Sequence, residues 1–142
     1  MIKIFILLGN ILPPPLNKYF YKYAGVKFKN IKKCWIGMFN HIDNYDPSMI
    51  VIGENVCISY KVLWVTHFDP TKSIKNHIIK SYKKEIVVED DVFVGAGSIL
   101  CPGIILKKNS FISTGSVVKS NVETYEIVEG NPAKKIGYLE NK

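Results

Sequence analysis

The sequence predicts an all-β fold in which short strands and corners repeat around a triangular coil, and three observations support this prediction. The chain has 142 residues, enough for one domain over residues 1–142. It holds 20 Ile and 13 Val against 8 Leu and 3 Ala, so β-branched side chains far outnumber the aliphatic residues that favour helices. From residue 88 onward an aliphatic residue returns at every sixth position, a period that is typical neither of an amphipathic helix nor of a simple strand.

The hexads keep one register through six consecutive repeats. Their first position is always aliphatic, at Val88, Val94, Leu100, Leu106, Ile112 and Val118. Their fifth position is small or β-branched, at Val92, Ser98, Ile104, Ser110, Ser116 and Val122. Three hexads close one triangular coil, so we expect the first-position side chains to point to the axis and form a core ladder without a chemical role.

The same register appears upstream, at Ile52, Ile58 and Trp64. Ile36 and Ile42 also look like first positions, but they are out of phase by four residues, so residues 43–49 must contain a bulge or a short loop. The segment from about residue 68 to about residue 85 breaks the hexads, and an insertion of that length in a regular coil can only loop outward. The sequence thus predicts an N-terminal capping segment over 1–30, coils with a protruding loop over 31–122, and a tail over 123–142.

The first twelve residues form an apolar run that ends at three prolines, Pro13, Pro14 and Pro15. The run is too short to span a bilayer and lacks a small-residue cleavage site. We expect it to pack on the domain or on a neighbouring subunit. A signal peptide and a peripheral membrane contact through residues 1–12 are the less favoured interpretations.

Cysteine and charge content exclude some functions. The cysteines, Cys34, Cys57 and Cys101, are odd in number and far apart, which favours neither a disulfide framework nor a CxxC site and fits a cytoplasmic protein. The net charge is +7, and every one of the 19 basic residues is Lys. The absence of Arg weakens any interpretation that needs bidentate contacts to bases or phosphates, and no nucleic-acid partner is expected.

Three segments carry a resemblance to a known family: Ile52 to His67, Val88 to Val122, and the Gly-Asn-Pro-Ala-Lys element that ends at Lys134. Together they resemble the hexapeptide-repeat acyltransferases, in particular the maltose, galactoside, xenobiotic and glycan O-acetyltransferase branch. The resemblance covers about residues 36–138. It implies a left-handed parallel β-helix, a homotrimer, and acetyl-CoA bound in a groove between adjacent subunits. The chain departs from the family at Phe93, where Trp is frequent, and in its helical N-terminal cap, which we expect to be reduced to a segment around residues 17–23.

Acyl transfer to a hydroxyl requires a base at neutral pH, and histidine is the residue best suited to that task. His67 ends the last regular hexad before the outward loop, and it matches the family's catalytic histidine in the motif Val65-Thr-His67. His77 lies in the polar loop and should face solvent, whereas His41 stays ambiguous. The expected mechanism is direct transfer, with His67 as general base and a backbone N–H of the adjacent coil stabilising the oxyanion. No cysteine is next to a candidate base, so a covalent intermediate is not expected.

Small residues one coil apart could line the arm of coenzyme A, and lysines beyond them could meet its phosphates. The predicted cofactor-binding residues are Gly95, Ala96, Gly97, Thr114, Gly115, Lys119 and Lys134. Residues of the irregular segment before Ile52 form a polar turn by sequence alone, but the resemblance implies that such a segment lines the acceptor pocket. The predicted acceptor-binding residues are Asn40, Asp43 and Asp46, with Tyr45 as a stacking surface for a sugar and Glu85 as a weaker candidate to orient His67.

The sequence therefore predicts an acetyl-CoA-dependent O-acetyltransferase that acts on a sugar or saccharide hydroxyl, with no metal required. The sugar rests on the resemblance alone. Within the acyltransferases, a serine or amino-sugar N- or O-acyltransferase is the competing interpretation. Outside them, the fold also suits a non-catalytic β-helix scaffold or a zinc-dependent carbonic anhydrase-like protein, although the latter needs three imidazoles and the histidine spacing here does not match.

Overall fold

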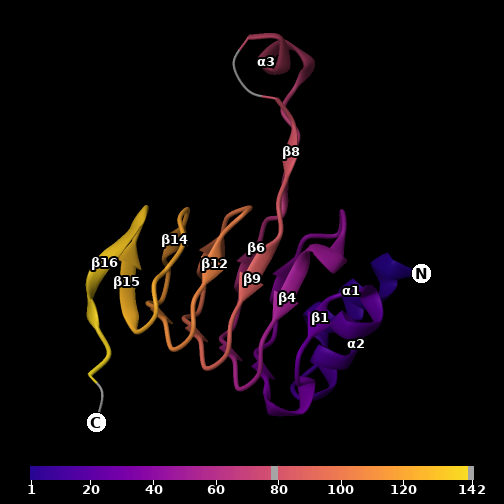
Figure 1. Ribbon diagram of the computed structural model, residues 1–142. Coiled ribbons are helices and arrows are strands. Elements are labelled where there is room, and N and C mark those ends of the chain that lie inside the picture. Colours follow the sequence, from indigo (N-terminus) through magenta and orange to yellow (C-terminus); the bar gives the residue numbers. More distant parts are fainter. Residues whose placement is uncertain (78–79, 141–142) are drawn as a thin grey trace.

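The computed structural model describes residues 1–77 and 80–140, and most of the chain winds through three parallel sheets (Figure 1). The first sheet contains β1 (Lys27–Phe28), β4 (Ile50–Ile52), β9 (Ile86–Val88) and β12 (Ile105–Leu106). The second contains β2 (Trp35–Ile36), β5 (Cys57–Ile58), β10 (Phe93–Val94), β13 (Phe111–Ile112), β15 (Glu126–Gly130) and β16 (Ala133–Tyr138), of which β16 is antiparallel. The third contains β3 (His41–Ile42), β6 (Leu63–Trp64), β11 (Ile99–Leu100) and β14 (Val117–Val118). The chain visits the sheets in turn, so each coil adds one strand to each of them.

The predicted core ladder is confirmed. Every first-position residue of the hexads is the last residue of its strand and is at most 2% exposed. Val94 lies in register with Ile58 on one side and with Ile112 on the other, and the second of these separations is the expected eighteen residues. Full burial of one such side chain contributes roughly 1.5–3 kcal/mol, so the ladder along the axis is the main source of stability.

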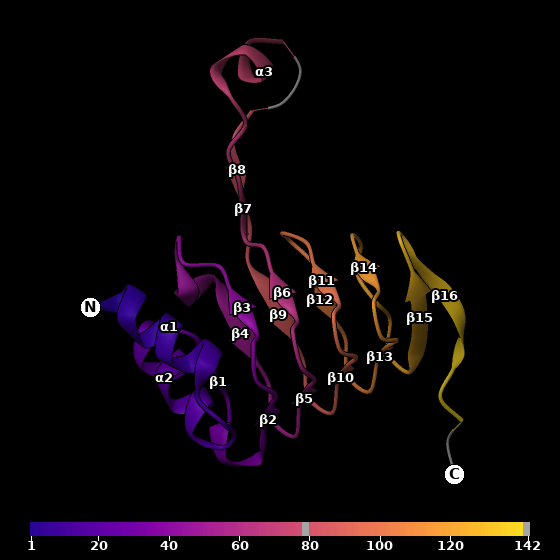
Figure 2. The same cartoon turned by 180° about the vertical axis from the view of Figure 1, so that it is seen from behind.

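Two N-terminal helices correct the all-β prediction. Helix α1 (Ile2–Ile11) and helix α2 (Leu16–Ala24) pack on each other beside β1, β2 and β3, at one end of the stack of coils (Figures 1 and 2). The helical segment expected around residues 17–23 is α2, but the expectation that the cap is reduced to this segment is wrong, because α1 precedes it. The helices form because burial outweighs propensity: Ile6 and Tyr21 are at most 4% exposed, and the Tyr21 hydroxyl donates to Asn10 Oδ1 at 3.1 Å.

The outward loop is a hairpin arm, as predicted, and Figures 1 and 2 show it projecting away from the coils. Strand β7 (His67–Phe68) pairs antiparallel with β8 (Tyr82–Lys83), and the short helix α3 (Lys72–His77) lies at the tip. The Asp69 carboxylate ties α3 to the two strands, because it accepts from Lys75 Nζ at 2.7 Å and from the Ser81 hydroxyl at 2.5 Å.

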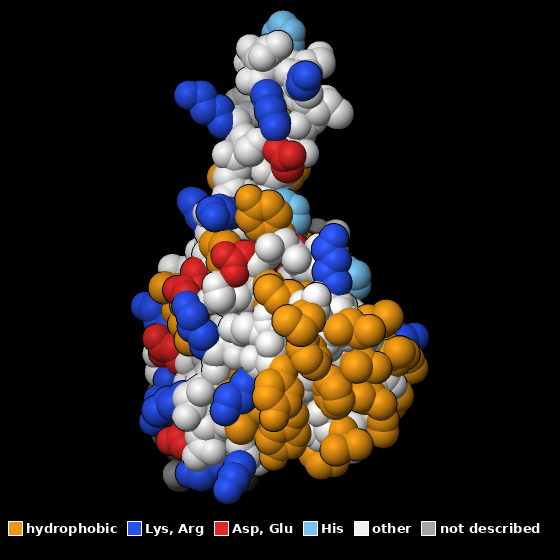
Figure 3. All heavy atoms as spheres, turned by 90° about the vertical axis from the view of Figure 1, so that its right-hand side faces the viewer, with side chains coloured by type: hydrophobic (Ala, Val, Ile, Leu, Met, Phe, Trp, Pro, Cys, Tyr) orange, Lys and Arg blue, Asp and Glu red, His pale blue; other side chains and the backbone are white. Residues whose placement is uncertain are grey.

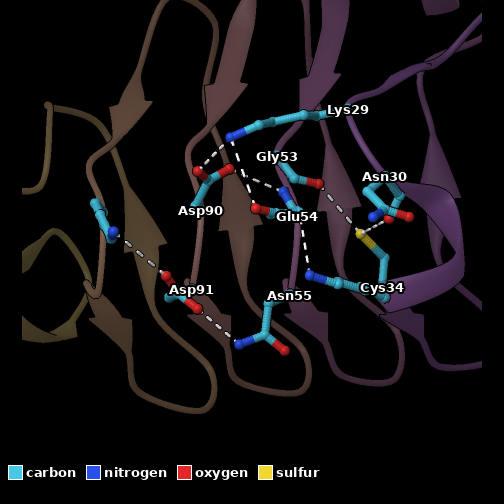
Figure 4. Close-up of polar contacts among 10 residues, drawn as sticks. Lys29, Asn30, Cys34, Gly53, Glu54, Asn55, Asp90 and Asp91 are labelled. Atoms are coloured by element: carbon cyan, nitrogen blue, oxygen red, sulfur yellow. Dashed lines mark hydrogen bonds and ion pairs between the residues drawn. The ribbon is translucent and has the colours of Figure 1, made fainter.

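The predicted bulge before Ile52 contains a 3₁₀ turn, η2 (Pro47–Met49), and a second such turn, η1 (Ile31–Lys33), precedes β2. Polar side chains tie neighbouring coils together elsewhere (Figure 4). Lys29 Nζ lies 2.6 Å from Asp90 Oδ2 and 3.9 Å from Glu54 Oε1, and the Glu54 N–H donates to Asp90 Oδ1. Exposed ion pairs of this kind contribute little to stability, but they fix the register of adjacent coils.

Within residues 1–77 and 80–140, no helix combines the length and the apolar character needed to cross a membrane.

Candidate active site

His67 lies where the chain leaves the third sheet and enters the arm. Strand β6 ends at Trp64, Val65 donates its N–H to Leu100 O in the next coil, and His67 opens β7. The imidazole Nδ1 lies 2.6 Å from Asp43 Oδ2, and about a third of the side chain (34%) is exposed. The ring is therefore fixed on one side and accessible on the other, as a base that meets substrate needs to be.

Asp43 is buried, and both of its carboxylate oxygens accept hydrogen bonds. Oδ2 accepts from the Thr66 N–H at 2.9 Å, from the Thr66 hydroxyl at 2.8 Å and from His67, while Oδ1 accepts from the Tyr45 N–H at 3.0 Å. Burial acts to raise the pKa of Asp43, but these hydrogen bonds outweigh it and hold the pKa below its usual value. An ionised carboxylate can only accept, so the proton of neutral His67 sits on Nδ1, and Nε2 keeps a lone pair.

A hollow of about 360 Å³ opens beside His67 at the base of the arm. It is lined by Tyr45, His67, Phe68, Asp69, Ser81, Tyr82 and Lys83. The rings of Tyr45 and His67 are stacked with their centroids 4.7 Å apart, and Lys83 Nζ lies 5.6 Å from the Tyr45 centroid. Aromatic faces combined with a few polar groups can accommodate a polar ligand with apolar ring faces.

A second groove, of about 440 Å³, leads from His67 to the two following coils. It is lined by Val65, His67, Phe68, Tyr82, Cys101, Pro102 and Lys119. His67 thus lies between two hollows, and the structure brings the predicted Lys119 into the same groove. Burial raises the pKa of the Cys101 thiol against the opposing charge of Lys119, so Cys101 is a protonated thiol rather than a nucleophile at neutral pH.

The other predicted cofactor residues occupy a different corner of the triangle. Gly95, Ala96 and Gly97 join β10 to β11, and Thr114 and Gly115 join β13 to β14, whereas His67 follows the third sheet. A Cβ on Gly95 would lie 2.5 Å from Thr114 N, so this glycine serves the contact between coils. Gly97 and Gly115 have φ of +69° and +72° and open space above them. Lys134 is an exposed residue of β16. One chain alone does not unite these residues with His67.

Two predicted acceptor residues make structural contacts within the chain. Asn40 is 1% exposed, and its amide donates to Gly37 O and to Ser59 O, both at 2.9 Å. Asp43 is committed to His67 and its neighbours, so an acceptor role for either residue is not supported by their contacts. Asp46 caps η2 by accepting from the Ser48 N–H and hydroxyl, which lowers the pKa of its carboxyl.

The residue that orients His67 is Asp43 and not Glu85, whose carboxylate lies 3.6 Å from Lys27 Nζ. His77 is exposed on α3, as expected. His41 shares a hollow of about 230 Å³ with Asp43 and His67. In the described part of the chain, no three His, Cys, Asp or Glu side chains gather closely enough to hold a metal ion.

The sequence did not predict Phe68, Tyr82 and Lys83 as lining residues. Only the pairing of β7 with β8 brings the second strand of the arm back to His67. The contact between Asp43 and His67, in contrast, could be predicted from the sequence. Once the four-residue phase shift is removed, Ile42 pairs with Trp64 in the next coil, and the register then sets Asp43 beside Val65 and close to His67.

No family model matches the chain. Over 87 residues the chain is 30% identical to a galactoside O-acetyltransferase of Lactococcus lactis, a match that covers 61% of this chain and 42% of that protein. A hexapeptide-repeat acetyltransferase from Vibrio cholerae, solved with acetyl coenzyme A, has a TM-score of 0.79 at 19% identity, over 99% of this chain and 86% of that one. A maltose O-acetyltransferase from Clostridium difficile has a TM-score of 0.73 at 21% identity, over 99% and 85%. The chain spans half or less of the length of the first curated relatives it matches.

The structural likenesses establish the fold. The chain therefore has the fold of the hexapeptide-repeat acetyltransferases, and its sequence is similar to that of a galactoside O-acetyltransferase.

Proposed function

We propose that the protein is an acetyl-CoA-dependent O-acetyltransferase whose acceptor is a sugar or saccharide hydroxyl. The observation that carries this proposal is the 2.6 Å contact between His67 Nδ1 and the buried Asp43, set between two hollows that could each take one substrate. The relatives supply the donor and the class of acceptor: one is solved with acetyl coenzyme A, and others are named for galactoside and maltose.

The reaction follows from the lone pair on His67 Nε2. The ring nitrogen takes the proton of the acceptor hydroxyl as the oxygen attacks the thioester carbonyl, and the resulting imidazolium is stabilised by the Asp43 carboxylate at Nδ1. The tetrahedral intermediate then collapses, the carbon–sulfur bond breaks, and His67 returns the proton to the departing thiolate. The Cys101 N–H already donates to Val118 O at 3.0 Å, so the donor to the oxyanion has to come from another backbone or side-chain group.

We place acetyl-CoA in the groove that runs from His67 to Lys119, where the lysine can meet a phosphate as a point charge. Gly97, Gly115 and Lys134 can contribute only from a neighbouring chain, because they lie at another corner. This favours a homotrimer of left-handed coils with active sites between subunits.

An outward ladder on the second sheet supports such an assembly. Trp35, Cys57, Phe93, Phe111 and Ile127 follow one another in register across five coils. The Phe93 and Phe111 rings are stacked at 4.7 Å, and Trp35 is 47% exposed. A strip of large apolar side chains on the outer side of a sheet fits burial against a second copy.

For the acceptor, the hollow at the base of the arm offers Tyr45 and Tyr82 as stacking surfaces and Asp69, Ser81 and Lys83 as hydrogen-bonding groups. Sugars combine apolar ring faces with hydroxyls, so this lining suits them. Three free cysteines, none of them in a disulfide, fit a cytoplasmic enzyme.

The test is an acceptor screen that follows thiol release from acetyl-CoA, with maltose, galactosides, amino sugars, serine and simple amines. We expect turnover with a saccharide hydroxyl and a loss of roughly 10²–10⁴-fold in His67→Ala. His77→Ala is the matched control, because His77 is exposed on α3 at the tip of the arm. Turnover with serine or an amine alone would refute the acceptor class, and full activity in His67→Ala would refute the mechanism.

A further inference from the structure

The outer side of the two N-terminal helices carries a large apolar surface. Eight apolar side chains on it are between 38% and 99% exposed: Met1, Ile2, Ile4, Leu7, Ile11, Leu16, Tyr19 and Tyr23. We call these residues the helical face. Figure 3 shows a continuous apolar area on this end of the molecule, with no acidic side chain inside it. Such an area on a domain surface indicates that something covers it.

The helical face is held outward by the packing beneath it. On the opposite side of α1, Gly9 is buried against Tyr21, and a Cβ at Gly9 would lie 2.6 Å from that ring. Asn10 O accepts from the Phe39 N–H at 2.8 Å, and Asn17 Nδ2 donates to Ile36 O at 2.9 Å. The helices are therefore docked on the first coil by their inner side, and they cannot turn to bury the outer one.

The charge of the chain is concentrated at the same end. Residues 1–42 contain seven lysines and no acidic residue, whereas residues 43–142 contain twelve lysines and twelve acidic residues. Counted along the sequence, the net charge of +7 thus arises from residues 1–42. Lys3 and Lys22 are exposed on the helices themselves, while Lys27, Lys29 and Lys33 pair with carboxylates of the coils.

We propose that the helical face docks on an anionic phospholipid surface, with α1 lying in the plane of the interface. Apolar side chains would enter the acyl boundary, Tyr19 and Tyr23 would sit at the headgroup level, and the lysines would meet lipid phosphates. The ten residues of α1 are enough for such a contact and too few to span the bilayer. The sequence alone favours packing of residues 1–12 on the domain or on a neighbouring subunit, and the packing on the domain uses only the inner side of the helices.

A second copy is the weaker occupant on grounds of charge. In a two-fold pair the same face meets itself, so the lysine-bearing end of one chain would approach the lysine-bearing end of the other. An anionic membrane carries the opposite charge, and it can adapt to the uneven shape of an apolar surface.

The experiment is sedimentation of the full chain with sucrose-loaded vesicles, either of phosphatidylcholine alone or with about 30% phosphatidylglycerol. We expect binding to the anionic vesicles that weakens as salt rises. Lys3→Glu and Lys22→Glu should each weaken binding about fivefold or more, since one lysine near an anionic surface contributes about that factor. Leu7→Glu should abolish binding.

Ile136→Glu is the matched control, because Ile136 is 59% exposed at the far end of the coils. Circular dichroism and thiol release with a soluble acceptor should be unchanged in Leu7→Glu, which separates this proposal from the proposed activity. Binding to neither vesicle would overturn the proposal, as would equal binding to both. It would also fail if Leu7→Glu dissociated a dimer in sedimentation velocity without any effect of lipid, since the face would then be a protein interface.

Discussion

Replacing Asp43 with Asn tests whether the buried carboxylate sets the protonation of His67. In the native chain Oδ2 accepts from three donors, at 2.6 Å from His67 Nδ1 and at 2.8 and 2.9 Å from the hydroxyl and N–H of Thr66. An amide has only one oxygen. If its NH₂ replaces Oδ2, it faces the Thr66 N–H and donates to His67 Nδ1, which moves the ring proton to Nε2. If its NH₂ replaces Oδ1, it faces the Tyr45 N–H instead, and the charge is still lost.

The expected magnitude follows from these contacts. A hydrogen bond to a charged group contributes about 1.5–3 kcal/mol. If that amount is lost from the transition state, where His67 is an imidazolium, kcat falls about 10- to 150-fold. The tautomer with the proton on Nε2 would deepen the loss, because it has no base to offer. The NH₂ of the new amide also faces a buried N–H, and two buried donors that face each other lower the free energy of unfolding by about 1–3 kcal/mol.

Thiol release at saturating substrates and thermal unfolding by circular dichroism measure the two effects. Asp90→Asn is the control, since Asp90 makes a similar 2.6 Å contact with Lys29 at the surface of the coils (Figure 4). The control should keep its rate and unfold at nearly the native temperature. A folded Asp43→Asn protein with a kcat within twofold of the native value would refute the role given to the carboxylate.

Four further outcomes are expected. Because hydrogen bonds hold the pKa of Asp43 below the usual 3.8, its stabilising contribution is complete above that pH and is lost as pH falls through the lower, folded-state pKa; acid unfolding of Asp43→Asn should lack this component. Gly95→Ala should lower stability by about 1–3 kcal/mol in thermal melts, because its Cβ would meet the backbone of the next coil. Lys119→Ala should raise the KM for acetyl-CoA with little change in kcat, as steady-state kinetics would show. Tyr45→Ala should raise the KM of the acceptor and leave that of acetyl-CoA unchanged.

The coils were predictable because one physical requirement repeats at a fixed interval. A triangular coil needs one buried aliphatic side chain at each side of the triangle, and residues such as Leu100 and Ile112, both 0% exposed, satisfy it in register. Each repeat confirms the phase of the last, so the signal grows with every hexad. The same repetition assigns Trp64 to the ladder although it replaces an aliphatic residue, and Trp64 is 1% exposed.

The helices were not predictable in the same way, because composition averages over the chain. The excess of Ile and Val describes the coils, and Ile2, Ile4 and Ile6 of α1 add to it although they are helical. What makes them helical is tertiary packing, seen in the burial of Ile6 and in the close approach of Gly9 to Tyr21, which no local pattern records.

Both departures from the repeat fall at one corner of the triangle, the corner that joins the third sheet to the first. The four-residue excess between β3 and β4 supplies Asp43 and Tyr45, and the arm between β6 and β9 begins at His67. In the next coils the same corner carries Pro102 and Lys119, which complete the groove. A regular hexad would present this corner to solvent with no base, no orienting carboxylate and no aromatic cover. The repeat thus supplies a rigid frame, and the candidate site lies where two insertions in successive coils meet. Breaks in the six-residue period therefore locate the site better than composition does.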